Sequence, residues 1–108
     1  MLFAKKYIAN DGHKCDSLSE KIIDDWFTAR KIQHECHVRY FGTRYSADFR
    51  VHNIYVEFFG LQGQLKSYDK LMKKKMDLIR TRHAKLISIY PTDLFPKSKL
   101  DDILSNLI

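Results

Sequence analysis

Two neighbouring segments, 45–51 and 54–59, constrain the fold most, because apolar and polar residues alternate along both. Such alternation is typical of strands that bury one face. Only His52-Asn53 separates the two segments, which predicts a hairpin closed by a two-residue turn. Counting back from this turn, Asp48 lies directly opposite Glu57 on the neighbouring strand.

The two faces of the predicted hairpin differ in chemistry. One face carries Ala47, Phe49, Val51, Ile54, Val56 and Phe58, and the other carries Asp48, Arg50, Tyr55, Glu57 and Phe59. Directly opposed side chains have Cβ atoms about 5 Å apart, so two carboxylates there repel each other. A divalent cation held between Asp48 and Glu57 would relieve that repulsion. Two alternatives remain open, namely that both carboxylates are solvated on an exposed face or that Arg50 neutralises them.

The rest of the chain reads as further helices and strands. We expect helices over 17–31, 64–83 and 97–107, and strands over 34–40 and 85–90, the last a buried strand ended by Pro91. Ser17 is a candidate N-cap with Glu20 three residues later, which is the capping-box pattern. The order helix, three strands, helix, strand, helix predicts one α/β domain over residues 1–108.

Composition narrows the class of protein. The chain has 108 residues, of which 44% are hydrophobic, enough for one small domain with a modest core. Lysine and arginine outnumber aspartate and glutamate by 19 to 13, and the net charge of +6 suits a polyanionic partner. No apolar run is long enough to span a membrane, and the N-terminal residues lack a signal peptide. With two cysteines and no such signal, we expect a cytoplasmic, reducing location. No glycine-rich phosphate loop is present, so no nucleotide cofactor is expected.

The carboxylate pattern resembles that of the PD-(D/E)XK nuclease superfamily. There, an Asp on one strand and a Glu or Asp on the next hold a metal, and a Lys two residues later assists catalysis. Asp48 and the triplet Glu57-Phe58-Phe59 match this pattern, except that Phe59 stands in place of the lysine and Ala47 in place of the usual proline. The stretches YSADFRV and IYVEFFG, with Tyr68 and Lys75 beyond them, are similar to a small single-domain branch whose lysine has moved to the following helix. The resemblance covers about residues 15–94, including the segment ISIYPTDL.

The resemblance implies a restriction-endonuclease-like α/β core with a mixed central sheet, and a divalent-metal-dependent DNA endonuclease activity. Asp48, Glu57 and the Phe58 carbonyl would hold the metal, and hard oxygen ligands favour Mg²⁺, with Mn²⁺ as a substitute. Glu20 matches the glutamate that many members add from the first helix, although a capping box alone would also explain it. Because Phe59 replaces the lysine, a non-catalytic nucleic-acid-binding module on a degenerate nuclease fold remains the alternative.

Helix phase indicates which of three consecutive lysines replaces the missing one. At about 100° per residue, Lys75 lies about 20° from Tyr68, whereas Lys73 and Lys74 lie at about 140° and 240°. The apolar stripe centred on Tyr68 comprises Leu65, Leu71, Met72, Met76, Leu78 and Ile79. Lys75 is therefore predicted to point toward the sheet and to assist catalysis.

The remaining basic residues of this helix are candidates for DNA binding. Lys73 and Lys74, with Arg80, would lie along phosphates beside a nuclease site, although such a run is most often a solvated helix face. Gln62 and Gln64 lie in a glycine-containing link just after the Glu57 strand, where the backbone could approach DNA closely. A homodimer is a further possibility, because two sites can then address two strands. The resemblance spans junction resolution, specific nicking, homing, restriction and helicase-associated cleavage.

Two segments contain a His-x-Cys unit, namely 13–15 and 34–36. Strong zinc motifs usually have the tighter Cys-x-x-Cys spacing. We therefore interpret these histidines and cysteines as ordinary residues of a loop and a strand rather than as a zinc site.

Overall fold

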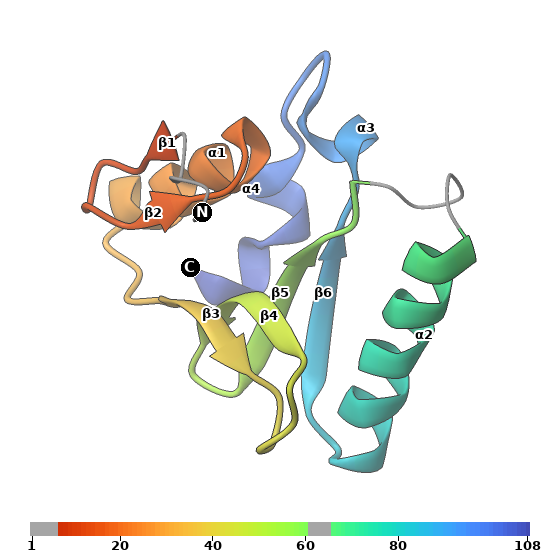
Figure 1. The fold of residues 1–108 in the computed structure, drawn as a ribbon. Coiled ribbons are helices and arrows are strands. Elements are labelled where there is room, and N and C mark those ends of the chain that lie inside the picture. The colour runs from red at the N-terminus through yellow and green to blue at the C-terminus, as the bar shows by residue number, and fades with distance from the viewer. Residues whose placement is uncertain (1–6, 61–65) are drawn as a thin grey trace, which may run out of the picture.

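The computed structural model describes residues 7–60 and 66–108 (Figure 1). Its elements are β1 (Tyr7–Ile8), β2 (Lys14–Cys15), α1 (Leu18–Ala29), β3 (Glu35–Arg39), β4 (Ser46–Val51), β5 (Ile54–Phe58), α2 (Lys66–Thr81), β6 (Lys85–Ile89), α3 (Pro91–Leu94), α4 (Leu100–Ile103) and the 3₁₀ helix η1 (Ser105–Leu107). Gln62 and Gln64 lie outside the described residues. No helix within the described ranges has the length and apolar character needed to cross a membrane.

The central sheet has four strands in the order β3-β4-β5-β6. The first three are antiparallel neighbours, whereas β6 runs parallel to β5. Parallel neighbours need a crossover connection, and α2 lies within that connection. The predicted α/β fold with a mixed sheet is therefore confirmed. The short β1-β2 hairpin forms a separate sheet that sequence analysis did not predict.

The β4-β5 hairpin has the predicted register. Val51 pairs with Ile54 and Phe49 with Val56, across a turn at His52-Asn53. The paired positions end at Phe49 and Val56, one position before Asp48 and Glu57. The Asp48 carboxylate instead accepts a hydrogen bond of 2.8 Å from the Phe58 backbone N–H. The two predicted carboxylates therefore lie next to each other, through a contact that the register alone did not specify.

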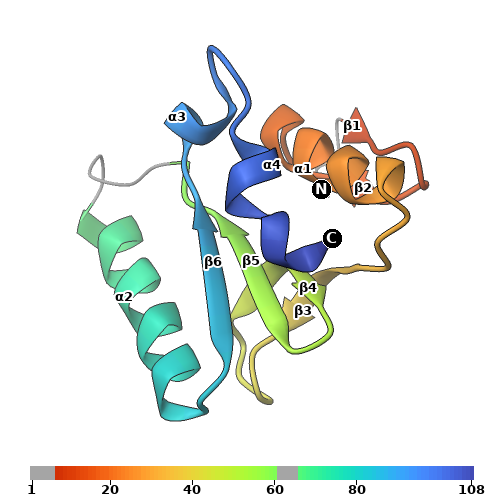
Figure 2. The same ribbon diagram turned by 180° about the vertical axis from the view of Figure 1, so that it is seen from behind.

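Helices cover both faces of the sheet, as Figures 1 and 2 show. On one face Phe49, Val51, Val56 and Ile89 pack with Ile23, Trp26 and Phe27 of α1 and with Leu94, Leu100 and Leu104. On the other face Tyr40, Ala47 and Tyr55 pack with Ile79 of α2. Ala47 thus belongs to the second cluster, and its predicted place beside Phe49 is wrong. An exposed second face is also excluded, because Glu57 is only 2% exposed.

Helix α1 begins at the predicted capping box. The Ser17 hydroxyl accepts a hydrogen bond from the Glu20 N–H, and the Glu20 side chain accepts one from the Ser17 N–H. These two bonds satisfy donors that the first turn of a helix otherwise leaves unpaired. The inward face of α1 then buries Ile23 and Phe27 completely.

The C-terminal part of the chain differs most from the prediction. The expected helix over 97–107 is a single turn, α4, followed by η1. Its side chains Leu100 and Leu104 are nevertheless buried, and the Trp26 indole donates a hydrogen bond of 2.8 Å to Asp101. The core thus extends past residue 94, where the family resemblance ends.

Two further expectations need correction. Strand β6 is the last strand in the sheet order, and only Ile89 of its residues is fully buried, so the expectation of a buried strand is wrong for most of its length. In α2, Met72 and Ile79 are buried as expected from the apolar stripe, but Met76 is 38% exposed.

Candidate functional site

Three elements bring charged side chains together where β4 and β5 face α2. Asp48 comes from β4, Glu57 from β5 and Lys75 from α2, and all three line a cavity of about 150 Å³. Glu20 reaches the same region from α1. We call these four residues the carboxylate site.

Glu57 is the most enclosed member of the carboxylate site. The Lys75 Nζ lies 2.9 Å from Glu57 Oε2 and 3.0 Å from Glu57 Oε1. The Tyr40 hydroxyl donates a further hydrogen bond of 3.0 Å to Oε2. Burial raises the pKa of Glu57 above its ordinary value, although Lys75 and the hydrogen bonds oppose that shift. Lys75, and not Arg50, is therefore the cation beside this carboxylate; Arg50 pairs with Glu35 on the neighbouring strand.

Within the described ranges, 7–60 and 66–108, no ion pair joins Asp48 to a cation. Its pKa is raised well above the ordinary value, first by burial and then by the charge of Glu57. Glu20 adds to the increase, whereas the hydrogen bond from the Phe58 N–H opposes it. A carboxyl group with this environment binds a proton or a cation more strongly than a solvated one.

Glu20 takes part in the helix cap and also lies beside Asp48. It is 7% exposed, and its carboxylate accepts hydrogen bonds of 2.7 Å from the Asp16 N–H and 3.2 Å from the Ser17 N–H. The Asp16, Glu20 and His37 side chains have ligand atoms within 4.8 Å of one another. Both interpretations of Glu20 left open by the sequence are therefore compatible with its position.

Helix α2 orients its lysines as its phase predicts. The Lys75 side chain is 13% exposed and contacts Glu57, whereas Lys73 and Lys74 are exposed on the outer side. Arg80 is exposed too and pairs with Asp77 at 2.8 Å. The structure thus separates one inward lysine from a basic outer surface.

The position where the superfamily pattern has its lysine is part of an aromatic cluster. Phe59 is 2% exposed, and its ring centroid lies 6.5 Å from that of Tyr68 and 6.1 Å from that of Tyr90. The Phe58 carbonyl, the third predicted ligand, accepts a hydrogen bond of 3.5 Å from the Tyr68 hydroxyl. An ammonium group at position 59 would have to be buried among these rings, at considerable cost.

The donor set of the carboxylate site fits a divalent cation. Asp48, Glu57 and Glu20 contribute three formal negative charges and Lys75 one positive charge, which leaves a formal charge of −2. Carboxylate and carbonyl oxygens are the ligands that Mg²⁺ and Mn²⁺ prefer. Burial, and after it the charges of Glu57 and Glu20, raise the pKa of Asp48 above its ordinary value.

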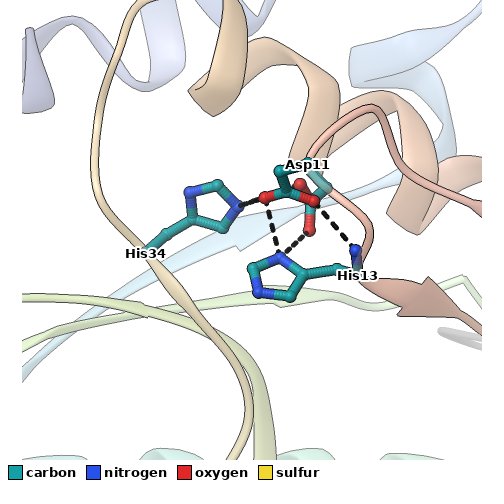
Figure 3. A group of neighbouring side chains, drawn as sticks. Asp11, His13 and His34 are labelled. Atoms are coloured by element: carbon teal, nitrogen blue, oxygen red, sulfur yellow. Dashed lines mark hydrogen bonds and ion pairs between the residues drawn. The ribbon is translucent and has the colours of Figure 1, made fainter.

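A second group of ligand-type side chains was not anticipated. Asp11, His13, Asp24 and His34 have ligand atoms within 4.8 Å of one another, and Figure 3 shows Asp11 between the two imidazole rings. We call these four residues the histidine–aspartate cluster. His13 and His34, interpreted from the sequence as ordinary residues of a loop and a strand, lie together here with Asp11 and Asp24. Sequence spacing offered no signal, because the four residues come from three separate segments.

Comparison of the chain with protein-family models, with curated proteins and with solved structures found no match.

Proposed function

We propose that the protein is a divalent-metal-dependent DNA endonuclease with a restriction-endonuclease-like core. The observation that carries this proposal is the convergence of Asp48, Glu57 and Lys75 from three elements on one small cavity. A buried Lys–Glu pair by itself does not indicate a function, because structural ion pairs of this kind also occur. A second carboxylate beside this pair costs free energy in the metal-free fold, which supports a functional role for Asp48.

Each group then has a distinct role in phosphodiester hydrolysis. Asp48, Glu57 and the Phe58 carbonyl would hold Mg²⁺, which when bound polarises a phosphate oxygen and activates water. The Lys75 ammonium would orient the attacking water or stabilise the negative charge that develops on the phosphate. Glu20 would supply a further acidic group from α1. The basic outer surface of α2, with Lys73, Lys74 and Arg80, supports binding of the DNA backbone.

The test is cleavage by the purified full chain of a panel of linear, supercoiled, branched and mismatched DNA. We expect cleavage of at least one substrate with Mg²⁺ or Mn²⁺ and none with EDTA. Asp48→Asn and Glu57→Gln should abolish cleavage while DNA binding stays nearly intact. Asp102→Asn, which removes an exposed carboxylate in α4, is the matched control and should cut like the wild type.

The outcomes also separate the two function classes. Binding of DNA without metal-dependent cleavage of any substrate would favour the non-catalytic nucleic-acid-binding module. Wild-type cleavage rates in Asp48→Asn or Glu57→Gln would show that the metal assignment is wrong, because neither variant retains both carboxylates.

A further inference from the structure

The histidine–aspartate cluster joins three segments of the chain. Asp11 and His13 belong to the β1-β2 hairpin, Asp24 to α1, and His34 to the residue just before β3. The His13 Nδ1 lies 2.8 Å from Asp11 Oδ2 and 2.9 Å from Asp24 Oδ2. The His34 Nε2 lies 3.0 Å from Asp11 Oδ2 and 2.9 Å from Asp24 Oδ1. Two imidazole nitrogens and two carboxylates thus lie close together, and Figure 3 shows Asp11 with the two histidines.

Asp24 makes this arrangement unusual, because its carboxylate is completely buried at 0% exposure. A buried carboxylate needs a cation or several hydrogen bonds to offset its loss of hydration. The nearest lysine of the helix, Lys21, pairs with Asp25 at 2.6 Å and not with Asp24. Among the residues that the structure describes, the ion-pair partners of Asp24 are the two histidines.

The orientation of the His34 ring suits its Nε2 atom to bind a metal ion. Its Nδ1 lies 2.9 Å from the Ile32 carbonyl oxygen, and a carbonyl only accepts, so Nδ1 carries the proton. A second ring proton on Nε2 would be donated to the two carboxylate oxygens that this nitrogen faces. Without that proton, the Nε2 lone pair faces these oxygens, and a metal ion between them would take the proton's place. A histidine that donates one N–H to a backbone carbonyl and turns the other nitrogen inward has the usual arrangement of a metal ligand.

We propose that Asp11, His13, Asp24 and His34 form a structural Zn²⁺ site, separate from the carboxylate site. Two carboxylates and two neutral imidazoles carry a formal charge of −2, which a divalent ion cancels. Four protein donors of nitrogen and oxygen type complete a tetrahedral site and leave no open position, as in structural zinc centres. The ion can enter from the solvent side, since a cavity of about 570 Å³ borders Asp11 and His34.

The spacing of the donors suits an ion after a small expansion. Zinc bonds to nitrogen and oxygen of about 2.0–2.1 Å place tetrahedral ligand atoms about 3.3 Å apart. The four N···O contacts of the cluster are 2.8–3.0 Å, so the donors need to separate by a few tenths of an ångström. Asp11 is exposed and His13 partly exposed, so the hairpin that carries them has room to shift.

Such an ion would tie the N-terminal hairpin to the rest of the fold. Strands β1 and β2 have two residues each, and a hairpin of that size is not stable by itself. Asp24 lies one helical turn beyond Glu20 on α1, so the ion would also hold the helix that places Glu20 beside Asp48. Cys36 supports the cluster from outside, because its thiol donates to Asp24 Oδ2 at 3.3 Å.

The test uses the full chain after treatment with a chelator, titrated with Zn²⁺ alone. We expect one tightly bound zinc per chain by elemental analysis. With free Zn²⁺ at a hundredfold excess over Kd, the melting temperature should rise by on the order of 10 °C. His13→Asn and His34→Asn should lose both effects. The matched controls His52→Asn and His83→Asn alter exposed histidines outside the cluster and should keep both, as should Glu57→Gln in the carboxylate site.

Replacement of zinc by Co²⁺ in the wild-type chain provides a readout that does not depend on the variants' folding. Visible absorption bands of a tetrahedral Co²⁺ ion without a near-ultraviolet thiolate band would support the assigned nitrogen and oxygen ligands. A thiolate band would overturn the ligand set, since it would place Cys36 or Cys15 on the metal. Absence of bound zinc in the wild type, or its loss in Glu57→Gln, would overturn the site itself.

Discussion

At the scale of single residues, the candidate chemistry depends on how Asp48 and Glu57 differ. Both are acidic residues on adjacent strands, yet Glu57 contacts an ammonium and a hydroxyl, whereas Asp48 accepts from one backbone N–H and faces two other carboxylates. This asymmetry leads to separate predictions for Lys75, which forms an ion pair with Glu57, and for Asp48.

Lys75→Ala should lower the single-turnover cleavage rate by about two orders of magnitude, the scale observed when one transition-state donor is lost. Lys73→Ala and Lys74→Ala remove the same charge from exposed positions, so they should leave the chemical step largely unchanged. They should weaken DNA binding and reduce its salt dependence by about one counterion each. Equal rate losses in all three variants at saturating protein would show that Lys75 has no special place in the chemistry.

Asp48→Asn should stabilise the metal-free protein at neutral pH. Folding raises the pKa of Asp48. The contribution of this carboxyl group to the free energy of unfolding is therefore fully present below its ordinary pKa near 3.8, and is lost as the pH rises through the raised pKa. Asparagine at this position cannot ionise, but its side-chain oxygen can still accept the hydrogen bond from the Phe58 N–H. The variant should therefore have a higher free energy of unfolding than the wild type at pH 7, and this gain should shrink toward pH 4.

Urea unfolding in EDTA at several pH values measures this effect, with Asp102→Asn as the exposed control. Added Mg²⁺ should stabilise the wild type and not Asp48→Asn. The difference in free energy of unfolding between the two proteins should therefore become smaller. A variant less stable than the wild type at pH 7 would mean that Asp48 is compensated in the folded protein.

At the scale of elements, the start of α1 combines a helix cap with the catalytic role proposed for Glu20. Ser17 and Glu20 exchange hydrogen bonds at the cap, while Glu20 also lies near Asp48. Two substitutions separate these functions, because a cap requires hydrogen-bonding geometry and metal chemistry requires a negative charge.

Ser17→Ala should lower the free energy of unfolding by about 1 kcal/mol and leave the cleavage rate of the folded protein nearly unchanged. Glu20→Gln keeps an acceptor for the cap but removes the charge, so it should lower the rate with a smaller loss of stability. Chemical denaturation and single-turnover kinetics on both variants provide the comparison. If Glu20→Gln cuts at the wild-type rate, Glu20 acts only as a cap residue.

At the scale of the whole molecule, the C-terminal residues close the main core. Leu100 is 1% exposed and Leu104 is 0% exposed, although α4 is a single turn. The tail is held further by Asp101, which accepts from the Trp26 indole and pairs with Arg30. The molecule therefore depends on residues beyond the stretch that resembles the nuclease superfamily.

Leu104→Ala should lower the free energy of unfolding by about 2–5 kcal/mol, because a cavity would replace a fully buried side chain. Ile108→Ala is the matched control at a position that is 75% exposed, and should change stability by less than about 0.5 kcal/mol. Urea denaturation monitored through Trp26 measures both. A small effect of Leu104→Ala would show that the tail does not contribute to the cooperative core.

The sequence by itself determined what depends on near neighbours along the chain. Alternation and the His52-Asn53 turn set the register of the hairpin, the Ser17–Glu20 spacing set the cap, and helical phase set the inward direction of Lys75. Each follows from a local periodicity or a local hydrogen bond, so a single chain segment contains all the information.

Only the tertiary structure decided what covers each face and which distant residues meet. Periodicity assigns Glu57 to a face, but α2 makes that face a buried one and so raises the pKa of the carboxyl group. The approach of His13 to Asp24 and His34 depends on how a hairpin, a helix and a strand pack together. Packing of this kind is a property of the whole set of contacts, and no spacing in the sequence records it.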